Sequence, residues 1–139
     1  MTIVRRATAL WNGTGKEGKG AISTQSKHLQ DAPYAFNTRF EDKPGTNPEE
    51  LIAAAHAGCF AMKLAFVIQS KGLEAQSLEV KAKVSLDDGA VQESKLVLKA
   101  HVEGIDDAAF AEMVKEAELN CPISKLLNCK IVVEFILNK

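Results

Sequence analysis

A long, mostly apolar run at residues 51–68 constrains this chain more than any other feature. Just before it, Thr46 or Asn47 can cap a helix, and Pro48 suits the first helical position. Lys71-Gly72 closes the run with a cation and a glycine, which together are a typical helix stop. The sequence therefore predicts one long helix from Pro48 towards Lys71.

This run also reaches the lower limit of a membrane span. His56 and Lys63 lie inside it, however, and a charged side chain near the centre of a bilayer is costly. We therefore expect a helix that is buried by its own protein. The first residues do not read as a signal peptide, so we expect a cytoplasmic protein in which thiols stay reduced.

The rest of the chain predicts strands before and after the long helix. The clearest is 77–87, where apolar and charged residues alternate strictly up to an Asp88-Gly89 turn. The other expected strands are 3–11, 21–26, 31–41, 93–103 and 131–137, and further helices are expected at 107–119 and from Pro122. The expected core residues of these segments are Leu96, Leu98, Ala100, Val102, Phe110, Met113, Val114 and Ala117. This order predicts one α+β domain over residues 1–139.

Composition limits the function classes. The net charge is -1, with 17 Lys and Arg against 18 Asp and Glu, and this argues against a nucleic-acid or membrane surface. Gly13–Gly20 resembles a phosphate-binding loop, but Gly20 stands where Ser or Thr is required, and a strand-like segment follows. A plain hairpin is the better interpretation.

Three cysteines carry the candidate chemistry: Cys59, Cys121 and Cys129. Cys59 is either an inert core thiol or a nucleophile that begins a new helix after a break at Gly58, since a helix start lowers a thiol pKa. A zinc site using His56 and Cys59 is a third alternative, although zinc normally takes four ligands. Cys129 is interpreted as a packed small hydrophobe.

Two further residues have open alternatives. Cys121 precedes Pro122 and is either buried at a corner or activated at a helix N-terminus. Arg39 is either a solvated cation paired with Glu41 or Asp42, or a fixed cation beside a thiolate, held by a carboxylate such as Glu49.

Two motifs resemble those of the OsmC/Ohr family. The first is NPEELIAAAHAGCF at residues 47–60, and the second is NCPISK at residues 120–125. The glycine hairpin after Trp11 and the segment TRFE at residues 38–41 fit the OsmC branch better than the Ohr branch. The resemblance extends over essentially the whole chain.

The resemblance implies a fold of antiparallel strands around a long buried central helix, in an intertwined homodimer. It implies a thiol-dependent peroxidase of oxidative or osmotic stress defence that reduces organic hydroperoxides and, more weakly, hydrogen peroxide. By this resemblance, Cys59 falls at the position of the peroxidatic cysteine and Cys121 at that of the resolving cysteine. Arg39 and Glu49 fall at the positions of the arginine and the acidic residue that support the reactive thiol. Arg5 or Arg6 is a weaker alternative for the arginine. No metal or cofactor is implied, but an external reductant is, either a small dithiol or a lipoylated or dithiol protein.

The alternative is a non-enzymatic dimeric stress protein that binds an apolar small molecule.

Geometry adds one expectation. Ten residues separate Glu49 from Cys59, which on a straight helix is about 15 Å along the axis. If Glu49 holds the arginine that serves Cys59, the helix should bend at Ala57-Gly58, or Arg39 must come from the partner chain of a dimer.

Overall fold

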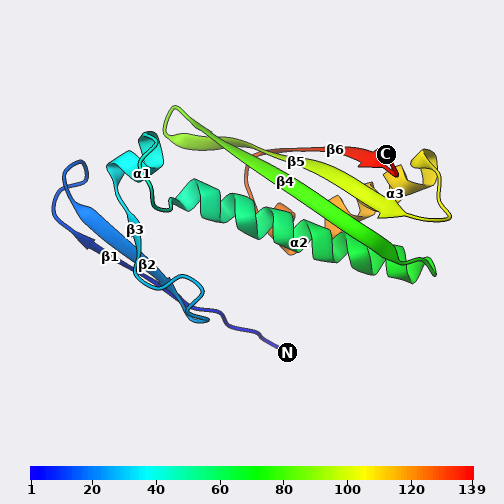
Figure 1. Ribbon diagram of the computed structural model, residues 1–139, viewed down its shortest axis with the longest axis horizontal. Helices are drawn as coiled ribbons and strands as arrows, with labels where there is room; N and C mark the ends of the chain where they lie inside the picture. Colours follow the sequence, from blue (N-terminus) through cyan, green and yellow to red (C-terminus); the bar gives the residue numbers. More distant parts are fainter. The chain divides into compact units, whose positions relative to one another are not determined.

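The computed structural model describes residues 1–139 and divides into two compact units, Met1–Leu51 and Ile52–Lys139. The first unit is a small antiparallel sheet followed by one helical turn (Figure 1). Its elements are β1 (Ala7–Asn12), β2 (Lys19–Thr24), β3 (Ala32–Tyr34) and α1 (Phe36–Phe40). The glycine-rich segment is the β1–β2 hairpin, as expected, so a strand and not a helix follows Gly20. That order excludes the phosphate-loop geometry, which needs a helix N-terminus.

The expected strand at 31–41 is wrong beyond Tyr34, because the chain turns there into α1. Thr38 Oγ1 accepts a hydrogen bond from the Ala35 amide at 2.8 Å and donates to the Ala35 carbonyl at 3.0 Å, which fixes the turn. Phe36 and Phe40 then stack one turn apart, with ring centroids 4.8 Å from each other. Over so few residues, apolar positions two and four apart fit either a strand or one helical turn.

The second unit contains most of α2 (Pro48–Ser70) and a second three-stranded sheet (Figure 1). Its other elements are β4 (Ala75–Asp87), β5 (Ala90–Val102), α3 (Asp107–Asn120), α4 (Pro122–Leu126) and β6 (Lys130–Leu137). Strand β4 pairs with β5 in the antiparallel sense, but β5 pairs with β6 in the parallel sense. The expectation of antiparallel strands throughout is therefore wrong for β6, because α3 and α4 carry the chain back before it enters the sheet. The α+β class is confirmed.

The part of the second unit's core that lies on β5 and α3 is the one predicted from the sequence. The alternating residues of β5 and the inward residues of α3 join Phe60 and Leu64 of α2 in one buried cluster. The expected core residues that are buried are Leu96, Leu98, Ala100, Val102, Phe110, Met113, Val114 and Ala117. Asp106 caps α3, as its position implied, by accepting a hydrogen bond from the Ala109 amide at 2.9 Å.

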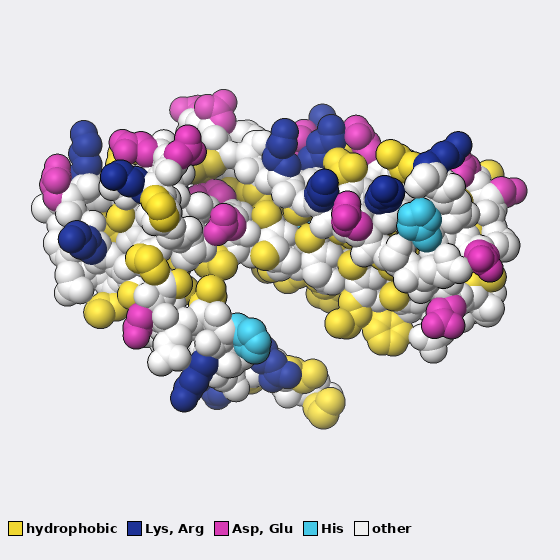
Figure 2. All heavy atoms as spheres, in the orientation of Figure 1, with side chains coloured by type: hydrophobic (Ala, Val, Ile, Leu, Met, Phe, Trp, Pro, Cys, Tyr) yellow, Lys and Arg dark blue, Asp and Glu magenta, His cyan; other side chains and the backbone are white.

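Helix α2 runs without a break through Gly58, so the expected bend is wrong. A Cβ at Gly58 would meet nothing within 4 Å, so no other part of this chain requires the glycine. One face of α2 is buried, through residues such as Phe60 and Leu64. On the opposite face Met62 is 66% and Phe66 61% exposed, and Figure 2 shows hydrophobic side chains exposed along the α2 side of this unit. A single chain therefore buries its long helix on one side only.

Candidate active site

Two cysteines from distant parts of the sequence meet in the second unit. Cys59 lies in the middle of α2, and Cys121 lies between α3 and α4, with Pro122 as the first residue of α4. Although 62 residues separate them, their sulfur atoms are 3.3 Å apart. A disulfide bond is about 2.05 Å long, so a small movement would join the two sulfur atoms. This pair is the centre of the candidate site.

The two thiols have different surroundings. Cys59 is half-buried, whereas Cys121 has no exposed surface. Burial raises the pKa of Cys59, and the contact with Cys121 adds to the rise, although the Ile123 amide and Lys63 oppose it. The pKa of Cys121 is lowered instead: burial opposes this, but the amide and hydroxyl of Ser124, the Cys59 thiol and the Ile123 amide together outweigh it. The surroundings of the pair therefore favour the thiolate of Cys121 more than that of Cys59.

These surroundings correct one expectation and confirm another. Cys59 does not begin a helix, because α2 is unbroken, so no helix start activates it. Cys121 does precede a helix, as the Cys-Pro pair predicted, and it occupies the N-cap position of α4. Cys129 lies just before β6, half-buried and free, and no contact joins it to the pair.

The sequence predicts no role for His56 other than that of a possible zinc ligand, but the structure places it in a buried polar network. It is fully buried, with Nδ1 2.6 Å from Ser94 Oγ and Nε2 2.8 Å from Ser124 Oγ. Because both ring nitrogens have hydroxyl partners, a zinc site shared with Cys59 would have to break one of these bonds. Its spacing could have revealed the position, since His56, Phe60 and Leu64 recur every four residues on the buried face of α2.

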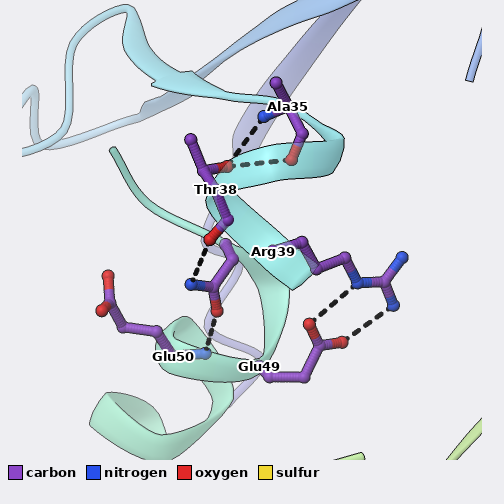
Figure 3. A network of polar contacts seen from close by, with 6 residues as sticks. Ala35, Thr38, Arg39, Glu49 and Glu50 are labelled. Carbon is purple, nitrogen blue, oxygen red and sulfur yellow. Dashed lines mark hydrogen bonds and ion pairs between the residues drawn. The ribbon is translucent and has the colours of Figure 1, made fainter. Parts of the chain in front are cut away.

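Arg39 and Glu49 form a two-pronged ion pair within the first unit (Figure 3). Arg39 Nε and Nη2 donate to the two carboxylate oxygens of Glu49, each at 2.9 Å. The partner is thus Glu49 and not Glu41 or Asp42. Hydrogen bonding to Glu49 raises the pKa of Arg39 further, so the guanidinium stays charged. Arg39 remains 38% exposed, against 14% for Glu49, which leaves part of the guanidinium free for another group.

The junction between α1 and α2 holds this pair in place. Asn47 Nδ2 donates to the carbonyl of Thr38 at 3.1 Å, and Asn47 Oδ1 accepts from the Glu50 amide at 2.8 Å. Asn47 therefore ties the turn that carries Arg39 to the first turn of the helix that carries Glu49. These contacts fix both ends of the ion pair (Figure 3).

An aromatic cleft of about 200 Å³ opens beside the same arginine. Its walls include Trp11, Tyr34, Phe36 and Phe40, and the Arg39 guanidinium stacks 5.1 Å from the centre of the Phe40 ring. A cleft with apolar walls and one fixed cation suits a ligand that has a hydrocarbon part and a polar head.

Comparison with known proteins agrees with the two motifs. The sequence model of the family described as OsmC-like protein matches residues 40–135. The chain is 43% identical to peroxiredoxin OsmC of Escherichia coli (strain K12), with 97% of each chain covered. It is 34% identical to the organic hydroperoxide resistance protein OhrA of Bacillus subtilis (strain 168), with 86% of each covered.

Solved structures share the fold. The crystal structure of OhrB from Bacillus subtilis is 26% identical, has a TM-score of 0.68, and covers 96% of this chain and 98% of its own. An OsmC-like protein of Vibrio cholerae has a TM-score of 0.76 at 15% identity, with 97% and 100% covered.

Proposed function

Because the chain belongs to the OsmC-like protein family, we propose that it is a peroxidase that reduces hydroperoxides with the thiols of Cys59 and Cys121. The observation that carries the proposal is the 3.3 Å approach of the two sulfur atoms. Relatives named as a peroxiredoxin and as organic hydroperoxide resistance proteins support the same reaction class.

In the first step, Cys59 is the thiol that meets peroxide, because it is half-buried whereas Cys121 is completely buried. Cys59 reacts as the thiolate after losing its proton to water, and the Cys121 thiol donates a hydrogen bond to it across the short contact. The Cys59 sulfur then attacks the peroxide, the O–O bond breaks, and the alkoxide takes a proton from water and leaves as an alcohol. Cys59 is oxidised to a sulfenic acid, and the peroxide is reduced.

In the second step, the Cys121 sulfur attacks the sulfenic acid of Cys59. An S–S bond forms, the S–O bond breaks, and the hydroxyl group leaves as water. An external dithiol then reduces the disulfide by thiol exchange and is itself oxidised to a disulfide. We propose a small dithiol or a lipoylated or dithiol protein for this role, in the cytoplasm, with no metal or bound cofactor.

Arg39 and Glu49 complete the proposed machinery. A charged, two-pronged guanidinium can stabilise a thiolate and hydrogen-bond the oxygen that leaves. Because α2 is unbroken, we propose that Arg39 reaches Cys59 from the partner chain of a homodimer, with Glu49 holding it. The aromatic cleft beside Arg39 would then accept the organic part of the substrate, which favours alkyl and aryl hydroperoxides over hydrogen peroxide.

The exposed face of α2 supports the homodimer. Ala55, Gly58, Met62 and Phe66 follow one another at helical spacing on that face, and each is exposed in the single chain. Burying such a stripe is favourable at about 25 cal/mol per Å² of apolar surface. A second copy of the chain is the occupant that the family resemblance implies.

Steady-state rates with cumene hydroperoxide and with hydrogen peroxide, each with a small dithiol, test the proposal. We expect faster turnover of the organic peroxide, complete loss in Cys59→Ser, and no change in the control Cys129→Ser. Cys121→Ser should react once and then proceed to the sulfinic acid at Cys59, which mass spectrometry detects. If the protein consumes neither peroxide, the proposal is wrong, and binding of an apolar ligand without catalysis becomes the better interpretation.

A further inference from the structure

A buried histidine lies behind the cysteine pair, and the reaction steps above give it no role. His56 bridges two elements through its ring nitrogens, contacting Ser94 of β5 and Ser124 of α4. A polar ring without exposed surface is costly unless its nitrogens are paired, whereas an apolar side chain would need no such partners. His56, Ser94 and Ser124 therefore occupy buried positions that apolar side chains could fill without hydrogen-bonding partners.

Ser124 connects this histidine to a cysteine. It is the third residue of α4, and Cys121 is the N-cap of the same helix, so the two residues lie three positions apart in its first turn. The amide and hydroxyl of Ser124 both favour the Cys121 thiolate. A hydroxyl has only one proton, however, so Ser124 can donate either to His56 Nε2 or to Cys121 Sγ.

The charge of His56, and the ring nitrogen that carries its hydrogen, decide between these two arrangements. Burial lowers the pKa of His56, so the ring is neutral and carries one N–H. If that hydrogen is on Nε2, Ser124 Oγ is the acceptor and its own proton is free for Cys121. Ser94 then supplies the hydroxyl proton that Nδ1 needs.

We propose that His56 is a positioning residue for the Cys121 thiolate: its Nε2–H donates to Ser124 Oγ, which turns the Ser124 hydroxyl proton towards Cys121 Sγ. His56 gains and loses no proton in this arrangement. The inference rests on the proposed function in taking Cys121 as the resolving thiol. The groups that favour the charge of that thiol are then Ser124 and the Ile123 amide from α4 and Cys59 from α2, with Lys63 acting on Cys59.

The test measures the pKa of Cys121 in Cys59→Ser/Cys129→Ser protein, where it is the only thiol, by ultraviolet absorbance of the thiolate. The same protein with Cys121→Ser is the blank. The side-chain amide of His56→Asn can take the place of Nδ1 but not of Nε2. The longer side chain of His56→Gln brings its amide to the position of Nε2. We expect His56→Asn and Ser124→Ala to raise the Cys121 pKa by about one unit, and His56→Gln and Ser124→Thr to restore most of it.

Ser94→Ala is the matched control, because it removes a buried hydroxyl from the same ring on the Nδ1 side. It should lower the melting temperature and raise the Cys121 pKa less than His56→Asn does, because the Nε2–H group that contacts Ser124 is still present. An equal pKa rise in Ser94→Ala, or no rise in His56→Asn, would overturn the proposal. Nitrogen NMR of the imidazole in the parent protein gives a test that needs no His56 variant: an Nε2–H tautomer supports the proposal, and an Nδ1–H tautomer contradicts it. None of these measurements uses peroxide, so failure here is distinct from failure of the peroxidase assay.

Discussion

Arg39 has one hydrogen-bonding partner for its guanidinium, the Glu49 carboxylate. An ion pair with this much exposure contributes only about 0.2–1 kcal/mol to stability, so its geometry matters more than its strength. Lys could replace the charge of Arg39 but not the two parallel hydrogen bonds.

Arg39→Ala should therefore lower kcat/KM for an organic hydroperoxide by about ten-fold or more, with little change in the melting temperature. Glu49→Ala should have a weaker effect, because it loosens the guanidinium without removing its charge. Lys95→Ala is a matched control, since it breaks another exposed ion pair, Lys95–Glu134 at 3.2 Å. Equal losses of activity in Arg39→Ala and Lys95→Ala would contradict the assignment.

Burial of His56 predicts a pH dependence of stability. The unfolded chain binds a proton at this residue below about pH 6.5, whereas the folded protein resists it because the pKa of His56 is lowered. The stabilisation is therefore fully present above that pH and is lost as the pH falls through it. We expect the free energy of unfolding, measured with urea, to fall by up to about 1.4 kcal/mol per pH unit below pH 6.5. His56→Gln should flatten this slope, and the control His28→Gln, at an exposed position, should keep it.

At the scale of the elements, the junction between α1 and α2 has one key side chain. Asn47 caps α2 and also hydrogen-bonds Thr38, so it links the two helices, as the Arg39–Glu49 pair does. The aromatic cleft and the Arg39–Glu49 pair both depend on that junction.

Asn47→Ala should lower the free energy of unfolding by about 1–3 kcal/mol, because two hydrogen bonds are lost. It should also lower peroxidase activity, since Arg39 and Glu49 are no longer held in register. Asp106→Ala removes the cap of α3 and should cost about 1 kcal/mol with peroxidase activity retained. Urea unfolding and steady-state rates measured on both variants check this difference, and retained activity in Asn47→Ala would refute it.

At the scale of the whole molecule, the exposed stripe on α2 is the feature that a single chain leaves incomplete. If the proposed homodimer forms through this stripe, Phe66→Glu, which places a charge in it, should shift the protein from dimer to monomer, as measured by analytical ultracentrifugation. Peroxidase activity should fall with it if Arg39 comes from the partner chain. Val97→Glu is the control, because Val97 is an exposed apolar residue on β5. A Phe66→Glu protein that remains dimeric would show that this stripe is not the interface.

Elements whose signals are local could be predicted from the sequence. Caps and stop residues defined α2 and α3, and strict alternation defined β4 and the buried face of β5. The two cysteine motifs predict the reactive residues, because spacing and residue type are properties of the chain. Around α1 the sequence predicts a strand where the structure has a helix, because a window of a few residues fits both periodicities.

How these parts meet depends on the packing of the folded chain. No local rule gives the 3.3 Å distance between Cys59 and Cys121, because it depends on how α2, α3 and α4 pack around β5. The same packing buries His56 between Ser94 and Ser124 and makes β6 parallel to β5. Helix and strand signals act over a few residues, whereas thiol pairing, buried polar contacts and strand direction depend on segments far apart in the chain.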